Sequence, residues 1–150
     1  MKISSKYSLL VFMLFFLGIL IVSCADSEST NSGVGELEEE VMYIHDDVMP
    51  KMSDIMKHKE KINELLTDST WHESNPEYVV NLRNTLDKLN QAEKEMWDWM
   101  HNYSDVYGQL QTEQQKSDFL LQEKEKISEV RTLMLESIEL AENELSKTPL

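Results

Sequence analysis

The chain contains little cysteine, proline, glycine or positive charge, and each scarcity narrows what it can be. One cysteine in 150 residues cannot form a disulfide within the chain. Three prolines and four glycines leave long stretches uninterrupted, and no stretch alternates apolar with polar residues as a strand does. The 14 basic residues face 28 acidic ones, a formal net charge of −14. Such a surface repels nucleic acid, so we expect no nucleic-acid partner.

The N-terminus has the pattern of a secretion signal. Two lysines lie in the first six residues, and residues 9–22 form an apolar run that ends just before Ser23 and Cys24. As a helix this run would span about 21 Å, which is short of a bilayer core roughly 30 Å thick. Residues 1–23 are therefore predicted to be a cleaved lipoprotein signal peptide rather than a transmembrane anchor.

Cys24 directly follows the predicted cleavage position. The sequence Ile-Val-Ser-Cys resembles the lipobox of bacterial lipoproteins, in which the cysteine is diacylated before cleavage. Each buried methylene contributes about 0.8 kcal/mol, so two or three acyl chains on Cys24 would anchor the chain to a membrane. Ala25 favours the outer membrane by resemblance to other lipoproteins. The expected location is the cell envelope, with the acyl chains making the membrane contact.

The rest of the chain divides into a short tether and one helical domain. Residues 24–35 comprise Cys24 and a run of small and polar residues, which predicts a flexible tether. Residues 36–150 are the predicted domain, and removal of the signal leaves the mature chain with a net charge of −16. An acidic surface of this kind repels anionic lipid, so the tether and its acyl chains must provide the attachment.

Apolar residues recur in steps of three and four along three segments, which predicts three amphipathic helices. The first covers about residues 36–66, the second begins at Pro76 and runs through Tyr103, and the third begins between residues 112 and 118 and runs through Leu145. We expect an all-α fold, an up-down-up three-helix bundle of long antiparallel helices. Pro50 predicts a kink in the first helix, because it cannot donate to the Asp46 carbonyl.

Antiparallel packing would gather the unusual residues of the three helices in one slice of the bundle. A turn centred near residue 71 places His45 level with Trp97 and Met49 level with Glu93. A second turn near residue 108 places Glu93 beside Glu123. Glu93 then lies at an interior position, where it is a candidate partner of His45 unless it reaches Lys94 or water at the edge of the bundle.

An aromatic and methionine-rich band on the second helix is the candidate interaction surface. Trp97 and Trp99 lie about 200° apart around the helix, so they cannot face the same neighbour. Aromatic residues and methionine are enriched at the centres of protein interfaces. The surface comprises Trp97, Trp99, Met100, Tyr103 and Tyr107. It predicts a lipid-anchored, non-enzymatic binding or scaffolding module that contacts a protein partner or a second copy of itself and needs no cofactor.

A metal or haem site is the alternative for the same slice. Thioether and imidazole are ligands that Cu(I) selects, and Met/His ligation also holds haem. The candidate ligands are His45, Met49, Met52, Met96 and Met100. Methionine also fills irregular gaps in a core around a kinked helix, so packing explains the same residues. A helical periplasmic holdase or stress sensor is a third hypothesis.

Catalytic motifs are missing from the sequence. It contains no Gly-rich phosphate loop, paired-histidine zinc motif or nucleophile elbow. His45 with Glu93 would make an acid–base pair, but a narrow three-helix bundle leaves little room for a buried substrate. We therefore expect a protein that is not an enzyme.

Two segments, Met42–Met52 (MYIHDDVMPKM) and Glu95–His101 (EMWDWMH), resemble a family of small helical lipoproteins of Bacteroidota-type bacteria. The similarity extends over Phe119–Ile127 to Ser137 and Ile138. Some members carry the automatic label "viral A-type inclusion protein", which is typical of generic long-helix similarity and implies no mechanism. The family has no established activity, so the resemblance implies an envelope location and a helical fold, with no catalytic residues to transfer.

Overall fold

The computed structural model describes residues 29–67 and 75–147, with side chains from residue 33 onward. The predicted signal peptide, Cys24 and the first part of the predicted tether lie outside the described residues. The chain divides into two units, residues 1–32 and residues 33–150, and the packing described below belongs to the second unit.

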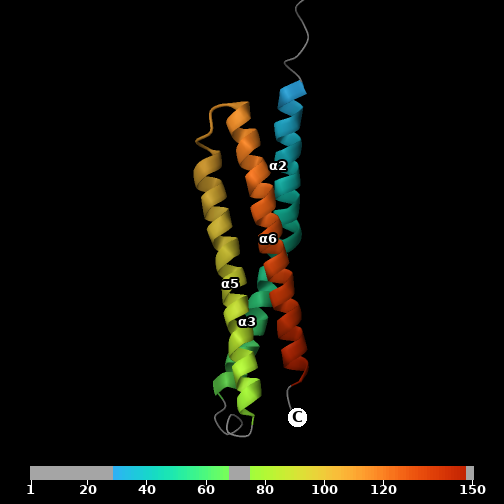
Figure 1. The fold of residues 1–150 in the computed structure, drawn as a ribbon, viewed down its shortest axis with the longest axis vertical. Helices are drawn as coiled ribbons and strands as arrows, with labels where there is room; N and C mark the ends of the chain where they lie inside the picture. Colours follow the sequence, from blue (N-terminus) through green and yellow to red (C-terminus); the bar gives the residue numbers. More distant parts are fainter. Residues whose placement is uncertain (1–28, 68–74, 148–150) are drawn as a thin grey trace, which may run out of the picture. The chain divides into compact units, whose positions relative to one another are not determined.

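The described residues are nearly all helical, and no strand occurs among them, which confirms the all-α prediction. No helix in these ranges is long and apolar enough to cross a bilayer. In chain order the elements are α2, Ser29–Val48; η1, a 3₁₀ turn, Met49–Lys51; α3, Met52–Thr67; α5, Pro76–Tyr107; and α6, Glu113–Ser146 (Figure 1).

The two long helices begin at the positions that their sequences indicate. Pro76 occupies the first turn of α5, where its missing N–H costs nothing. Thr112 caps α6 through a capping box, in which its hydroxyl accepts from the Gln115 N–H at 3.2 Å and the Gln115 side chain accepts from the Thr112 N–H at 3.1 Å. The start of α6 at Glu113 lies within the predicted window.

The first helix begins earlier than the sequence predicts. We expected it to start at Glu36, whereas α2 starts at Ser29, so residues 29–35 are helical where a flexible tether is predicted. Val34 gives the physical reason, because it is buried with the core residues of the domain. At this position helical backbone keeps the peptide groups paired while the side chain is buried.

One 3₁₀ turn separates α2 from α3 at the proline. η1 contains Pro50 in its first turn, where the proline ring has no N–H to donate. The Ser53 hydroxyl donates to the Pro50 carbonyl at 2.9 Å. Val48 before the turn and Met52 after it are both buried, so the apolar face continues across the interruption.

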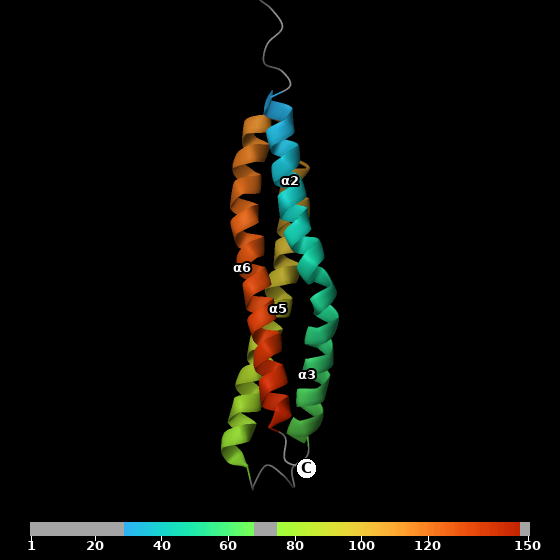
Figure 2. The same ribbon diagram turned by 90° about the vertical axis from the view of Figure 1, so that its right-hand side faces the viewer.

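The core runs along the faces that α2, α3, α5 and α6 turn toward one another. Contacts are most extensive between α5 and α6, and α3 packs against both (Figures 1 and 2). Buried apolar residues come from every helix: Val34, Val41, Val48, Met52, Ile55, Ile62, Leu82, Leu89, Ala92, Met96, Trp99, Leu120, Ile127, Val130, Met134, Ile138 and Ala141. Most of them follow the predicted three-and-four spacing.

Two ion pairs and one His–Glu contact join α6 to α2 and α3. Glu40 accepts from Lys124 at 2.5 Å, Asp47 pairs with Arg131 at 3.0 Å, and His58 lies 3.9 Å from Glu142. In each pair the two residues are 84 positions apart in the sequence. The first two pairs lie before the 3₁₀ turn and the third lies after it, so the pairing of residues is unchanged across Pro50.

Candidate functional site

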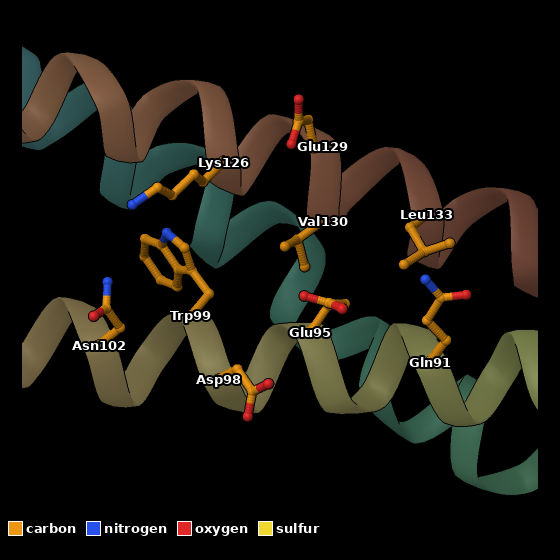
Figure 3. Close-up of a pocket in the computed structure, with 9 residues that line it drawn as sticks. All are labelled: Gln91, Glu95, Asp98, Trp99, Asn102, Lys126, Glu129, Val130 and Leu133. Atoms are coloured by element: carbon orange, nitrogen blue, oxygen red, sulfur yellow. The ribbon is translucent and has the colours of Figure 1, made fainter.

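A groove of about 540 Å³ lies between α5 and α6. Figure 3 shows its lining residues projecting from the two helices, with the Trp99 side chain between them. The lining residues are Gln91, Glu95, Asp98, Trp99 and Asn102 from α5, and Lys126, Glu129, Val130 and Leu133 from α6.

The groove has an apolar floor and an acidic rim. Trp99 and Val130 are buried, and Leu133 is packed against the core. Three carboxylates belong to the rim: Glu95 and Asp98 on α5 and Glu129 on α6. Lys126 is the one basic lining residue, and its Nζ donates to Glu123 Oε1 at 2.7 Å. The groove is therefore an apolar surface with an excess of negative charge around it.

A row of aromatic rings packs against Trp99, which forms part of the floor of the groove. The His45 ring of α2 stacks on Trp99 with 5.5 Å between ring centroids, and Tyr103 lies 5.1 Å from Trp99. The row continues to Tyr107 at 5.3 Å from Tyr103, and both tyrosines contact Phe119 of α6. Ring pairs at these separations are favourable beyond their buried area. Residues of α2, α5 and α6 thus fix the position of Trp99.

Several buried polar atoms beside this row have no hydrogen-bond partner among the described residues. They are Trp99 Nε1, the Tyr103 hydroxyl and Glu123 Oε2. Glu123 is fully buried, and its other carboxylate oxygen accepts from Lys126. Buried polar groups are usually paired, so unpaired ones in one region indicate an arrangement that packing alone does not explain.

The two tyrosines of the row are held in the neutral form. Burial, together with the negative charges of Glu38 and Glu123, raises the pKa of Tyr103 to about 12. Burial likewise raises the pKa of Tyr107, whose hydroxyl donates to Glu38 at 2.6 Å. Burial and the acidic groups around this end of the domain therefore disfavour ionisation of either tyrosine.

The predicted interaction surface is divided between the core and the exterior. Trp97 is 45% exposed, whereas Trp99 is only 6% exposed and belongs to the core. Met100, Tyr103 and Tyr107 are partly buried and packed against that core. The expectation of one aromatic surface on α5 therefore needs correction, because only Trp97 extends well into solvent. The two tryptophans do face different neighbours, as their spacing predicts.

The five candidate metal ligands lie in or against the same core. Met52 and Met96 are buried, Met49 and Met100 pack on the core, and the His45 ring stacks on Trp99 with its Nδ1 2.9 Å from Asp46. Within the described residues no group of three or more His, Cys, Asp or Glu side chains is placed to hold a metal ion. The Cu(I) or haem alternative stays a prediction.

The predicted pairing of Glu93 with His45 was wrong. Glu93 is partly buried and pairs with Lys59 of α3, whereas His45 contacts Asp46 and Trp99. Glu123 instead lies near Tyr103 of α5, and its negative charge adds to burial and to the charge of Glu38 in raising the pKa of the Tyr103 hydroxyl. The chain passes from α5 to α6 through residues 108–112, so the turn is centred beyond Gly108 and the two helices pair further along than predicted.

Sequence reasoning missed the groove itself. Gln91, Glu95, Asp98 and Asn102 recur in steps of three and four, which places a polar stripe beside the buried face of α5. The sequence indicates that stripe, but it does not indicate which residues of another helix lie opposite it. The residues opposite it, Glu129, Val130 and Leu133, follow only from how α5 and α6 pair.

Comparisons with known proteins identify no relative. No family model matches the chain, and neither the curated proteins nor the solved structures contain a match.

Proposed function

We propose that the protein is a lipid-anchored, non-enzymatic helical module of the cell envelope that binds a protein partner through the groove between α5 and α6. The signal peptide, acylation of Cys24, an outer-membrane location and membership of the small helical lipoprotein family belong to this proposal. They rest on the sequence pattern and on the resemblance described above. In this proposal the groove is the binding surface, instead of the wider candidate interaction surface predicted on the second helix.

The domain is proposed to be an up-down-up three-helix bundle whose first helix is kinked at Pro50. Ring contacts and ion pairs support this arrangement: α2 and α3 contact α5 through residues whose numbers rise in one helix and fall in the other. His45 with Trp99 and Lys59 with Glu93 show this order. The constant separation of 84 residues in the pairs with α6 supports a first and third helix that run in the same direction.

One feature supports binding at the groove above the others. The Trp99 indole forms part of a concave apolar floor, and its buried Nε1 has no acceptor among the described residues. Binding sites are typically concave and apolar with a few polar groups placed among them. Trp is also the residue type most enriched among the energetically dominant residues of protein interfaces. A partner segment in the groove would cover this floor.

Site-specific crosslinking in the source bacterium tests the proposed function. A photoreactive residue replaces Leu133 in the groove, and the matched control replaces Leu135, which is on the same helix outside the groove. We expect a protein adduct of defined mass from position 133 and none of that mass from position 135. No adduct at 133, or equal adducts at both positions, would contradict binding at the groove.

The anchor is tested separately from the groove. Mass spectrometry of the mature chain should show an N-terminal Cys24 that carries acyl chains, and Cys24→Ser should abolish both the acylation and the membrane association. A wild-type chain that starts elsewhere, or that lacks acyl mass, would refute the lipoprotein prediction while leaving the groove proposal unaffected.

A further inference from the structure

The rim of the groove is electrostatically unbalanced. Asp98 forms an ion pair with Lys94, and Lys126 is engaged by the buried Glu123. Glu95 and Glu129 form no ion pair among the described residues, although they lie on opposite sides of the apolar floor. Two unpaired carboxylates across a hydrophobic floor favour an occupant with positive charge on both of its flanks.

The acidic groove continues along α6. A second hollow of about 490 Å³ shares Glu129 and Leu133 with the first and adds Glu125 and Glu136 to its lining. From Lys126 to Glu136 the helix rises about 15 Å at 1.5 Å per residue. That length matches about three turns of another helix lying along α6, so the surface suits an elongated segment better than a single side chain.

Charge also decides which occupants are disfavoured. A second copy of the mature chain would bring another formal charge of −16 toward an acidic rim, and an anionic lipid surface would meet the same repulsion. Like-charge juxtaposition across an interface is costly and suppresses wrong partners. A basic segment from a different protein would be attracted to the acidic rim and not repelled by it.

We infer that the groove binds a basic amphipathic helix of a partner protein, with its apolar side chains on Trp99, Val130 and Leu133 and its basic side chains toward Glu95 and Glu129. This inference rests on the proposed function and specifies its partner. An amphipathic helix laid in a hydrophobic groove is a recurring mode of peptide recognition. Flanking charges set the specificity and the association rate, and the apolar face supplies the affinity.

Synthetic peptides and the full chain test this directly. The probe is a helical peptide of about 14 residues with leucine on one face and lysine or arginine on both flanks. One control peptide carries glutamate in place of the basic residues, and a second has the probe's composition in scrambled order without an apolar face. We expect the probe to bind in calorimetry, the binding to weaken as salt is raised, and neither control to bind comparably.

Matched variants separate groove binding from attraction to an acidic chain. Glu95→Gln with Glu129→Gln removes both unpaired rim charges, and Glu60→Gln with Glu139→Gln removes two exposed charges elsewhere on α3 and α6. The rim double variant should weaken the probe about tenfold. The control pair should change binding less than about twofold. Circular dichroism of both variants confirms that the helices are retained.

The outcomes distinguish the inference from the function on which it rests. Equal binding of the scrambled peptide, or equal weakening by both variant pairs, would overturn the inference. If position 133 crosslinks to a cellular partner but the probe does not bind, the partner is not a basic helix and the groove function stands. If position 133 gives no crosslink and the probe does not bind, both the proposed function and this inference are wrong.

Discussion

The imidazole ring of His45 stacks on the indole ring of Trp99, with 5.5 Å between the ring centroids and 28° between the ring planes. This contact joins α2 to α5 at the point where Trp99 also forms the floor of the α5–α6 groove. His45 is held in turn by Asp46, 2.9 Å from its Nδ1. A residue of the first helix thus determines the position of a side chain that lines a groove between the other two.

Trp99 should tolerate loss of its N–H better than loss of its ring. Trp99→Ala removes a buried aromatic side chain and should lower the free energy of unfolding by about 3–5 kcal/mol. Trp99→Phe keeps an aromatic ring and breaks no hydrogen bond, since Nε1 has no partner among the described residues, so about 1–2 kcal/mol is expected. Urea unfolding followed by circular dichroism measures both. Trp97→Ala, the control, should cost less than about 1 kcal/mol, and similar losses at the two positions would contradict the burial of Trp99.

The N-terminus of α6 should depend on its capping box. Thr112→Ala removes the hydroxyl that accepts from the Gln115 N–H, so the free energy of unfolding should fall by about 1 kcal/mol. Thr132→Ala is the matched control, because the Thr132 hydroxyl only bonds back to the Ser128 carbonyl within the helix. That variant should be neutral or slightly stabilising, since alanine is the better helix former. Equal losses in thermal unfolding would exclude a specific cap.

Tyr103 should make the domain sensitive to alkali. The pKa of its hydroxyl is about 12 in the folded protein and about 10 when unfolded, so folding disfavours the ionised form. Its contribution to stability is complete below pH 10 and is lost as the pH rises toward 12, by less than about 3 kcal/mol. Tyr103→Phe should therefore lose less stability than the wild type between pH 9.5 and 11.5. Urea titrations at both values provide the test, and an identical loss in the two proteins would argue against a raised pKa.

The pairing of α2 with α6 should withstand an exchange of charges. Asp47 and Arg131 are about half exposed, so each single reversal, Asp47→Arg or Arg131→Asp, should cost less than about 1 kcal/mol. The double reversal restores an ion pair and should recover most of that loss, with a coupling energy of about 0.2–1 kcal/mol in a double-mutant cycle. Additive losses would mean that the two side chains do not meet in solution.

The sequence predicted the helices well because its apolar spacing and caps act locally. Thr112 with Gln115, and Pro76 in the first turn of α5, define helix starts from a few neighbouring residues. The early start at Ser29 escaped prediction because it depends on Val34 finding a place in the core, which no local pattern shows. Pro50 was recognised as an interruption, and the structure adds that it forms a single 3₁₀ turn.

The candidate site was only partly accessible from the sequence. The spacing of Trp97 and Trp99 showed that the two residues face different ways, but which of them is buried depends on where α2 and α6 lie around α5. Glu93 was expected in the interior and instead pairs with Lys59, because a displacement of about one helical turn between neighbouring helices changes every cross-helix partner. Helix periodicity determines which face of its own helix a residue occupies. It does not determine which residues of a neighbouring helix lie at the same level.

The sequence by itself determined the helical class, the amphipathic faces and the acidic charge of this protein, since these follow from composition and from local spacing. Only the tertiary structure decided that Glu95 and Glu129 flank a common floor and that Trp99 lines it. Those relationships join residues 30 or more positions apart through the relative shift of packed helices, and that shift is set by the interlocking of whole side-chain surfaces.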